Sequence, residues 1–599
     1  MPAPRRIDGY APIQDYALIG DGRTTALVAR DGSIDWLPLP RMDSTTVFGR
    51  LLDAKRGGAF ELAPEEEFEV ERAYAGDSNV LQTTFRTARG VVRVTDAIPL
   101  DHGALLPWFE LIRRVDGLEG SVPMRWRVTP RFKAGEGDER PSLEQRNGAV
   151  LVEGREGIVA LHLFDAGTAT LHDEEIVGTF ETSPGSSGAL VMRSTHEEPL
   201  PFPRLDWIYA RLDETVDDWE RWLADAGVEG QWKDMTRRSA LVLRLLTYVP
   251  TGAILAAPTT SLPERIGGDR NYDYRYSWVR DTAYTLDALL NLGLLVQVHA
   301  SFAWLLRAVA SSLPDVHVFY DIHGETASGQ KELGLAGYRG SRPVRRGNAA
   351  AKQLQLSCWG DLLETAELYV RDGNALDEVT GRRLADAVDR LTKVWDEKDA
   401  GIWELPDKQH YTLSKVAAWM AIDRALRLAE AGEVPDDRVD AWRETAEAIR
   451  AFVERECWSE GRSAYAMHAG SDRLDASVLR ISRMNYLDTR GERFNSTIDR
   501  IRTELSGGGP LLYRYSGQRQ EEGAFVACSF WLVEALARAG RLDEARETMD
   551  ELVALANDVG LYSEEIDPRM HDFLGNFPQG LSHLALINAA AAIAEEESR

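Results

Sequence analysis

Two sequence patterns meet at the stretch Asp213-Glu214-Thr215-Val216-Asp217-Asp218-Trp219-Glu220-Arg221-Trp222-Leu223-Ala224-Asp225-Ala226. Its apolar residues, including both tryptophans, recur at the spacing of an amphipathic helix, so we expect residues 213–231 to link two domains. The length of the chain, 599 residues, agrees with this division, because a single hydrophobic core stops growing well below that size.

Residues 1–212, before this stretch, carry the pattern of β structure. Short runs rich in β-branched and aromatic residues recur between turn signals, which predicts an antiparallel β-sandwich. The segment 133–148 is charged and rich in glycine, and we expect it to be an exposed loop. The predicted strands include residues 25–29, 80–87, 91–98, 109–115, 122–128, 149–152 and 158–164.

Residues 232–599 carry the pattern of helices, with apolar residues at three- and four-residue spacing in long segments. No tight repeat marks a solenoid, so we expect a closed barrel of paired helices with the functional residues on the loops at one end. The predicted helices include residues 235–248, 281–292, 300–311, 349–371, 376–395, 413–431, 437–456, 494–505, 524–539, 542–556 and 580–595.

The charge of the chain narrows the class of partner. Sixty-nine Lys and Arg residues against 96 Asp and Glu residues give a formal net charge of −27, which repels nucleic-acid phosphates and anionic lipid. We therefore expect no nucleic-acid or membrane partner, and a small neutral substrate. With no apolar stretch of about 18 residues, no signal-peptide pattern and only three cysteines, we expect a cytoplasmic protein. The sequence leaves a homo-oligomer open.

A dense aromatic run ends on an adjacent arginine and aspartate, in Gly267-Gly268-Asp269-Arg270-Asn271-Tyr272-Asp273-Tyr274-Arg275-Tyr276-Ser277-Trp278-Val279-Arg280-Asp281. Aromatic rings accept the C–H face of a sugar by stacking, and a charged pair makes strong hydrogen bonds to hydroxyl groups. The run therefore favours a polyhydroxylated, uncharged ligand. A tyrosine-rich helix start with a structural ion pair is the alternative.

Cleavage of a glycoside needs an acid that protonates the leaving oxygen and a second carboxylate opposite it. Glu404 follows Ile402-Trp403, and a carboxyl beside a tryptophan in a dry pocket has a raised pKa, as such an acid requires. Glu522 directly precedes an apolar helix, whose amide dipoles favour the ionised form that a base requires. Taken alone, each also fits an ordinary structural glutamate, and Arg514 fits either a sugar anchor or a surface ion pair.

Further blocks, spread over nearly the whole chain, resemble one enzyme family. They are Asp15-Tyr16-Ala17-Leu18-Ile19-Gly20-Asp21, Asp31-Gly32-Ser33-Ile34-Asp35-Trp36-Leu37, Ala257-Pro258-Thr259-Thr260-Ser261-Leu262-Pro263-Glu264, Gly337-Tyr338-Arg339-Gly340-Ser341-Arg342-Pro343-Val344, Gly347-Asn348-Ala349-Ala350, Gly401-Ile402-Trp403-Glu404, Glu522-Gly523-Ala524-Phe525 and Leu574-Gly575-Asn576-Phe577-Pro578-Gln579. In these blocks the chain resembles glycoside hydrolase family 15, the glucoamylase, glucodextranase and bacterial trehalase group. Many blocks in one order make the resemblance specific.

The resemblance implies a trehalase-like β-sandwich (1–212), the linker helix (213–231) and an (α/α)6 barrel (232–599). It also implies exo-acting hydrolysis of terminal α-glucosides with inversion. By position, Glu404 matches the general acid and Glu522 the general base of the family. The glucose clamp is matched by Tyr274, Trp278, Arg280 and Asp281, and further wall positions by Ile402, Trp403 and Arg514. We expect neither a metal nor a cofactor, since no calcium-loop spacing appears.

At some positions the sequence departs from the family pattern, so the identity of the sugar that is cleaved off stays undecided. Many bacterial members carry Glu-Val-Arg-Gly where this chain has Glu404-Leu405-Pro406-Asp407. Many relatives also carry Gln-Leu-Asp-Val-Tyr-Gly-Glu where this chain has Gln355-Leu356-Ser357-Cys358-Trp359-Gly360-Asp361. We slightly favour α,α-trehalose, with α-1,4 or α-1,6 gluco-oligosaccharides as the alternative. A disaccharide phosphorylase and a non-catalytic carbohydrate-binding protein are more remote, because both candidate carboxylates are present.

Overall fold

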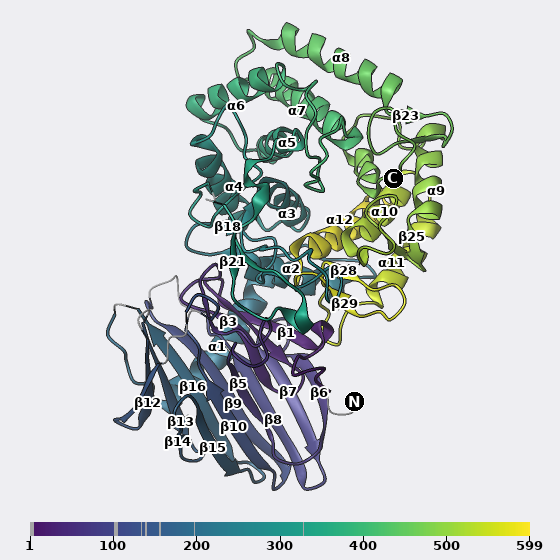
Figure 1. Ribbon diagram of the computed structural model, residues 1–599. Helices are drawn as coiled ribbons and strands as arrows, with labels where there is room; N and C mark the ends of the chain where they lie inside the picture. Colours follow the sequence, from purple (N-terminus) through teal and green to yellow (C-terminus); the bar gives the residue numbers. More distant parts are fainter. Residues whose placement is uncertain are drawn as a thin grey trace.

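The computed structural model describes residues 5–100, 106–132, 134–137, 141–154, 157–196, 198–326 and 329–599. Figure 1 shows the strands of the N-terminal part gathered at one end of the molecule (purple and blue) and the later helices at the other (teal to yellow). The predicted order, an antiparallel β domain followed by a helical domain, is confirmed.

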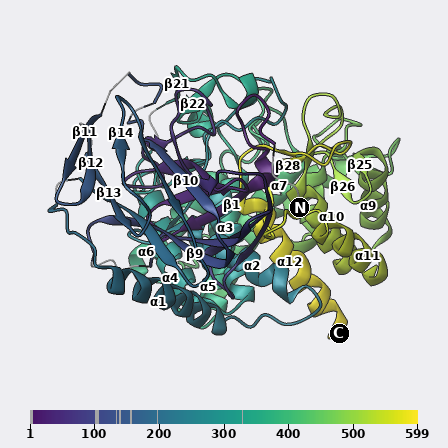
Figure 2. The same cartoon turned by 90° about the horizontal axis from the view of Figure 1, so that it is seen from below.

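Two antiparallel sheets form the N-terminal part. The first has the order β1 (Tyr16–Gly20), β2 (Thr25–Ala29), β3 (Ser33–Pro38), β5 (Ala59–Pro64), β10 (Pro123–Thr129), β15 (Ile176–Glu181) and β14 (Thr170–Leu171), with β4 (Thr46–Phe48) paired to β3. The second has the order β11 (Ser142–Arg146), β12 (Ala149–Gly154), β13 (Gly157–Phe164), β16 (Ser187–Thr195), β9 (Phe109–Gly120), β8 (Gly90–Ala97), β7 (Leu81–Thr87) and β6 (Phe68–Tyr74). Every residue of β1, β2 and β3 is buried, because this part of the first sheet lies between the second sheet and the helical part (Figure 2).

The predicted loop 133–148 is partly wrong. Lys133 and residues 138–140 lie outside the described residues, but Ser142–Arg146 forms strand β11, which pairs with β12. Asn147 and Gly148 both have positive φ, 51° and 80°, so they form the tight turn typical of Asn-Gly hairpins. The strand escaped prediction because it lies at a sheet edge, where charged residues are favoured.

The predicted linker helix begins earlier than expected. Helix α1 spans Leu205–Ala224, starting soon after Pro203, and its first half is not a linker. Ile208 and Leu212 pack on the face of the second sheet that is turned away from the first sheet. The helix therefore completes the β domain before the chain enters the helical part.

The helical part is a barrel of paired segments. The inner ring consists of α3 (Val279–Asn291), α5 (Ser357–Arg371), α7 (Thr412–Glu430), the 3-10 helix η4 (Ala476–Arg483), α10 (Val526–Arg538) and α12 (Gly580–Glu597). Consecutive members contact each other, and α12 closes the ring on α3. The outer segments are α2 (Lys233–Leu246), α4 (Leu295–Ala310), α6 (Glu378–Leu391), α8 (Val439–Glu456), α9 (Glu492–Glu504) and α11 (Leu542–Val553). This is the predicted (α/α)6 arrangement.

Two departures from the predicted helices both concern the inner ring. The segment η4 was not predicted, because it is short and carries two arginines within a buried run. The predicted helix 349–371 is broken into η3 (Ala349–Lys352) and α5, since Gln353 between them is extended. The side-chain amide of Gln353 donates to the backbone carbonyl of Glu404, 3.0 Å away, so the break serves the loop that carries Glu404.

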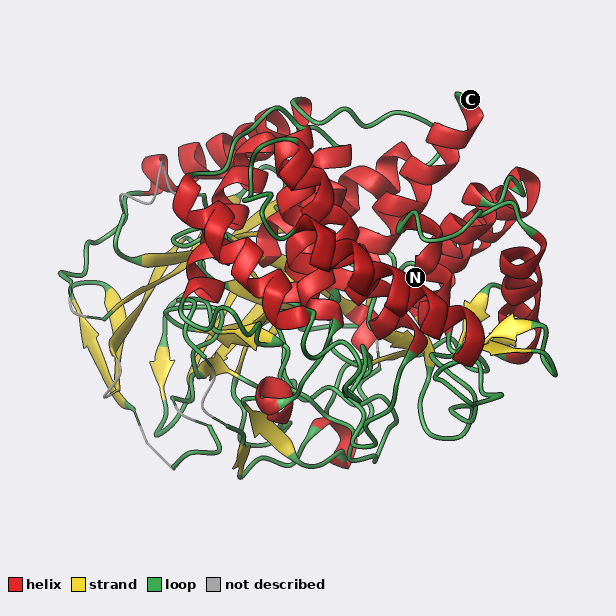
Figure 3. Ribbon diagram, turned by 90° about the horizontal axis from the view of Figure 1, so that it is seen from above, coloured by secondary structure: helices red, strands yellow, loops and turns green. Residues whose placement is uncertain are grey.

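The loops that lead into the inner helices collect on one side of the helical group (Figure 3). Trp278 precedes α3, Trp403 and Glu404 precede α7, Phe525 precedes α10 and Gln579 precedes α12, and all five line one cavity. The amide dipoles at these helix N-termini favour negative charge. No helix in the described part of the chain combines the length and apolar character needed to cross a membrane.

Candidate active site

The cavity at this end of the barrel has a volume of about 430 Å³. It brings together all the predicted site residues except one: Tyr274, Trp278, Arg280, Asp281, Ile402, Trp403, Glu404 and Arg514. Glu522 is not among the lining residues, and Glu564, which sequence reasoning missed, is.

Glu404 is held in an unusual backbone conformation at the end of a tight turn. Its φ is +59°, in the left-handed region that non-glycine residues rarely adopt and that occurs preferentially at functional sites. The turn depends on Gly401, at φ +67°, because a Cβ there would lie 2.7 Å from the ring of Tyr411. The residues Gly401–Glu404 therefore form a turn that places the carboxyl of Glu404 in the cavity.

The surroundings of the Glu404 carboxyl raise its pKa, so it stays protonated to a higher pH than an exposed glutamate does. Burial raises its pKa, while the positive charge of Arg280 and a hydrogen bond from Trp278 act against that rise. The indole Nε1 of Trp278 donates to Oε1 of Glu404 at 2.7 Å. A buried carboxyl with a raised pKa is suited to give a proton.

Arg280 and Asp281 form a rigid polar pair beside Glu404. The guanidinium donates to both carboxylate oxygens of Asp281, at 3.0 and 3.1 Å, and its Nη1 donates to the carbonyl of Ile402 at 3.0 Å. Asp281 lies in the first turn of α3, where the helix dipole favours its charge. The pair presents fixed donors and acceptors of the kind that bind vicinal hydroxyls.

Glu522 lies behind the cavity wall in an ion-pair cluster. Its Oε1 accepts from Nε of Arg514 at 2.8 Å, and its Oε2 accepts from Nη1 of Arg270 at 2.8 Å and from Nη2 of Arg514. The side chain is fully buried. Three guanidinium donors therefore bind its two oxygens, and the carboxylate is not among the residues that line the cavity.

Glu564 also lines the cavity and is held by a second aromatic residue. Tyr274 donates its hydroxyl to Oε1 of Glu564 at 2.6 Å, and Tyr274 packs edge-on against Trp278, with ring centroids 5.5 Å apart. Each of these two rings thus holds one carboxyl, Glu564 or Glu404. Burial raises the pKa of Glu564, while the Tyr274 hydrogen bond and the charge of Arg514 lower it.

The position of Glu564 explains the block Leu574–Gln579. The backbone N–H of Asn576 donates to Oε2 of Glu564 at 3.2 Å, and a Cβ at Gly575, whose φ is +71°, would lie 2.4 Å from that oxygen. Only glycine fits this approach of backbone to carboxylate. The signal available in the sequence was the pair Glu564-Glu565 between Ser563 and Ile566, together with this downstream glycine.

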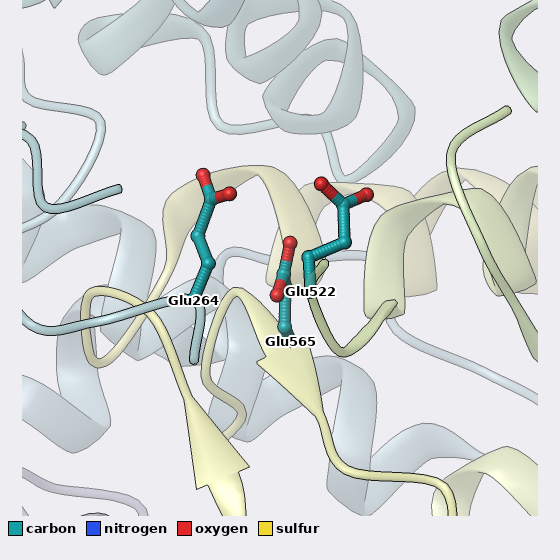
Figure 4. A group of neighbouring side chains, drawn as sticks. All are labelled: Glu264, Glu522 and Glu565. Atoms are coloured by element: carbon teal, nitrogen blue, oxygen red, sulfur yellow. The ribbon is translucent and has the colours of Figure 1, made fainter. Parts of the chain in front are cut away.

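Three buried glutamates, Glu264, Glu522 and Glu565, come from three different segments and point toward a common space (Figure 4). One carboxylate oxygen from each lies within 4.8 Å of one oxygen from each of the other two. Nη2 of Arg514 donates to Glu264 at 2.9 Å and lies 3.8 Å from Glu565, so a guanidinium already supplies the positive charge. Burial and the neighbouring carboxylates raise the pKa of Glu264 to about 8, although Arg514 lowers it. We do not assign a metal to this cluster.

Comparisons with known proteins agree with this architecture. Residues 230–591 match the model of the glycosyl hydrolases family 15, and residues 8–169 match that of the trehalase-like N-terminal domain. The chain is 32% identical to a trehalase of Thermoplasma volcanium, covering 98% of this chain and 94% of that protein. It is 34% identical to a trehalase of Mycobacterium tuberculosis, covering 98% of this chain and 91% of that protein.

A solved structure shares the whole fold. The crystal structure of a bacterial glucoamylase complexed with acarbose superposes with a TM-score of 0.74 at 13% identity, over 100% of this chain and 97% of that chain. Family, fold and the carboxylate-lined cavity agree with the resemblance seen in the sequence, and the chain is therefore a glycoside hydrolase that belongs to the glycosyl hydrolases family 15.

Proposed function

We propose that the enzyme hydrolyses α,α-trehalose to two glucose molecules, acting on α-glucosidic bonds with inversion at the attacked anomeric carbon. The observation that carries this proposal is the pair of carboxyls, Glu404 and Glu564, which line one cavity and are held by two adjacent aromatic rings. The preference for trehalose rests on relatives of that name, aligned over nearly the whole chain.

In this proposal Glu404 is the general acid. Its protonated carboxyl gives the proton to the glycosidic oxygen as the bond from that oxygen to the anomeric carbon breaks. The raised pKa of Glu404 supports the assignment, because activity then persists to a higher pH than an exposed glutamate would allow.

We assign the role of general base to Glu564 in place of Glu522. A base must reach the attacking water, and Glu564 lines the cavity whereas Glu522 is buried under three guanidinium donors. Glu564 takes one proton from water while the oxygen bonds to the anomeric carbon from the face opposite the leaving group. A carboxylate whose pKa is raised toward the working pH is the stronger base for this step.

The remaining lining residues position the sugar. Arg280 and Asp281 supply hydrogen bonds to hydroxyls of the terminal glucose, and Trp278 and Tyr274 supply aromatic surface for its ring. Ile402, Trp403 and Arg514 form further parts of the wall. Because an exo-acting enzyme takes the terminal sugar into the closed end of its pocket, we place that sugar beside Asp281, whose side chain is only 4% exposed.

Hydrolysis of α-1,4 or α-1,6 gluco-oligosaccharides is the second candidate. Leu405 and Pro406, which follow the acid where many bacterial members carry Val-Arg, line the same cavity and alter the side that meets the leaving group. An apolar pair there makes fewer hydrogen bonds to a second sugar, and this departure keeps the linkage open.

The test is glucose release from trehalose, maltose, isomaltose and maltotriose, with and without phosphate. We expect trehalose to give the highest kcat/KM, with equal initial amounts of α- and β-glucose by NMR, because only the attacked unit inverts. Faster release from maltose or isomaltose would support the second candidate. Glucose 1-phosphate formed only in the presence of phosphate would make the enzyme a phosphorylase.

The proposal also covers the compartment in which the enzyme works and the division of the chain into domains. We propose that it works in the cytoplasm as a carbohydrate-processing enzyme, supported by the free, buried cysteines Cys358, Cys457 and Cys528, which suit a reducing compartment. We keep the division into a β domain (1–212), a connecting helix (213–231) and a catalytic barrel (232–599), although α1 already belongs to the β domain by its packing.

A further inference from the structure

The exposure of charged side chains in the cavity changes from its closed end to its mouth. The side chains of Asp281, Arg280 and Arg514 are 4%, 14% and 11% exposed, whereas that of Arg270 is 33% exposed. Asp269 and Pro406, which also line the cavity, are exposed. If the terminal glucose fills the closed end, as in the proposed function on which this inference rests, the leaving sugar lies at the mouth beside Arg270.

Arg270 stands on a loop that is fixed at both ends. Gly268 N–H donates to the carbonyl of Arg265 at 2.8 Å, closing a tight turn, and Glu264 N–H donates to the carbonyl of Arg270 at 3.3 Å. Asn271, fully buried, donates its side-chain amide to the carbonyls of Gly268 and Pro343 at 3.2 and 3.3 Å. The loop therefore presents the Arg270 side chain from a set position.

The guanidinium of Arg270 is anchored by one nitrogen. Nη1 donates to Oε2 of Glu522 at 2.8 Å and to Oε1 of Gln518 at 2.9 Å, and both of these partners are buried. Nη2 lies 4.0 Å from Glu521, beyond hydrogen-bond reach, and in the described part of the chain neither Nη2 nor Nε has an acceptor. Donors of Arg270 thus remain for a ligand in the mouth.

Glu522 joins this arginine to a second one that lines the cavity. It binds Arg270 through Oε2 and Arg514 through both oxygens, so this carboxylate lies between two guanidinium groups and offsets part of their mutual repulsion. Because Glu522 is fully buried, its charge is little screened by solvent. The arrangement sets the distance between two cations that face one cavity.

We propose that Arg270 binds hydroxyl groups of the leaving sugar, and that Glu522 is the positioning residue that holds Arg270 and Arg514 for this contact. Arg270 is then a specificity-determining residue for substrates that carry a second sugar. The competing view is that Arg270 only balances the charge of the buried glutamates.

The test compares two substrates that differ in the leaving group, a disaccharide and α-D-glucosyl fluoride, whose fluoride carries no sugar. We expect Arg270→Met to lower kcat/KM for the disaccharide about 10- to 100-fold, mainly through KM, and to change that for the fluoride less than about threefold. Arg270→Lys should recover part of the loss. Arg265→Met, an exposed arginine on the same loop, is the matched control and should leave both substrates unchanged.

The Glu522→Gln variant tests the positioning role. It should also reduce hydrolysis of the disaccharide more than hydrolysis of the fluoride. The double variant with Arg270→Met should lose little more activity than either single variant, because both changes remove the same contact between Arg270 and the leaving sugar. Thermal unfolding of each variant checks that the fold is retained. Equal loss on both substrates, or no loss on either, would overturn the inference.

The wild-type rates separate this inference from the proposed function. Trehalose and maltose rates of the unaltered enzyme decide the natural substrate, and whichever disaccharide it cleaves faster serves in the comparison with the fluoride. The proposed function fails if trehalose is not cleaved. The inference fails only if the Arg270 variants do not discriminate between disaccharide and fluoride.

Discussion

At the scale of single residues, the proposed active site places two buried carboxyls beside side-chain donors that influence their pKa. Trp278 and Tyr274 each give one hydrogen bond, to Glu404 and Glu564, and each bond lowers a pKa that burial has raised. On balance the pKa of both carboxyls stays above its ordinary value, which suits groups proposed to exchange a proton with the substrate and with water.

The bond from Trp278 makes a pH prediction. In Trp278→Phe the ring remains but the donor is lost, so the pKa of Glu404 rises. Because activity requires protonated Glu404, it is lost as pH rises through that pKa, and the alkaline limb of kcat/KM should move to higher pH. The pH profile of kcat/KM measures this.

Trp304→Phe is the matched control, since the Trp304 indole is buried, lies outside the cavity and has no hydrogen-bond partner in the described residues. Its alkaline limb should not move. A Trp278→Phe limb that is unchanged, or shifted to lower pH, would contradict the assigned role of this bond.

Gly575 allows the closest backbone approach to the proposed base. In Gly575→Ala the new Cβ would lie 2.4 Å from Oε2 of Glu564 and would force this carboxylate out of its position. We therefore expect kcat to fall about 100-fold or more. Gly470→Ala separates this clash from backbone strain, because Gly470 has nearly the same φ, +70°, and an added Cβ there meets nothing within 4 Å. Backbone strain should cost both variants about 1 kcal/mol of stability, and the clash adds a further loss in Gly575→Ala alone. Similar kcat losses in both would contradict the explanation.

At the scale of elements, a three-stranded sheet decides which glutamate reaches the cavity. Strands β27 (Ala524–Phe525), β28 (Glu565–Ile566) and β29 (Phe573–Leu574) pair in that order. They bring Glu522 and Glu564 close together from segments about 40 residues apart in the sequence. Glu404 was proposed as the acid from its own neighbours, Gly-Ile-Trp, whereas the proposed choice of Glu564 over Glu522 depends on this non-local pairing.

The fold was predictable where periodicity is strong and local. The order of β and α domains and most barrel helices follow from apolar spacing, and the outcome agrees with it. Strand β11 was missed because its edge position selects polar residues, and η4 because a short 3-10 helix has no long period. The early start of α1 was missed because its packing on the sheet is a tertiary effect.

His583 of α12 gives an element-scale prediction for stability. The ring is fully buried, contacts Ser239 of α2 and accepts from the N–H of Tyr562, and burial lowers its pKa from 6.5 to about 3. The unfolded chain therefore binds a proton between these pH values and the folded one does not. This histidine should lower the unfolding free energy by about 1.4 kcal/mol per pH unit as pH falls below 6.5.

Urea unfolding at pH 6.5, 5.5 and 4.5 measures this slope. His583→Gln should show a shallower fall than the wild type, and His571→Gln, at an exposed position, should show the wild-type slope. Equal slopes in all three proteins would rule out the His583 contribution.

At the scale of the whole molecule, the β domain braces the segments that form the cavity. Trp36 donates its indole N–H to the carbonyl of Pro258, and Asp53 accepts from the N–H of Ala336, at 2.9 and 3.1 Å. Arg275, next to Tyr274, donates to the carbonyl of Ser44 at 2.8 Å. The sandwich thereby supports the aromatic run from behind without entering the cavity, since no described residue before Ala256 lines it.

Arg72 provides the test of this coupling. Its buried guanidinium pairs with Asp558 of the barrel at 3.0 and 2.5 Å and also donates to the carbonyls of Asp15 and Val28. Arg72→Met should cost about 3 kcal/mol of unfolding free energy, because Asp558 is left without this partner. Arg89→Met, which breaks an exposed pair with Glu181, should cost less than about 0.5 kcal/mol. If both variants unfold at the wild-type denaturant concentration, the domain contact contributes nothing.

The most direct measurement of the central claim is hydrolysis of α-D-glucosyl fluoride by Glu564→Ala, with and without sodium azide. Azide needs no base and fits the space left by the carboxylate. We expect a loss of about 1000-fold without azide, and recovery with formation of β-D-glucosyl azide when azide is added. A Glu564→Ala enzyme that keeps near-normal activity, or loss and azide recovery in Glu522→Ala instead, would contradict the assignment of Glu564 as the base facing Glu404.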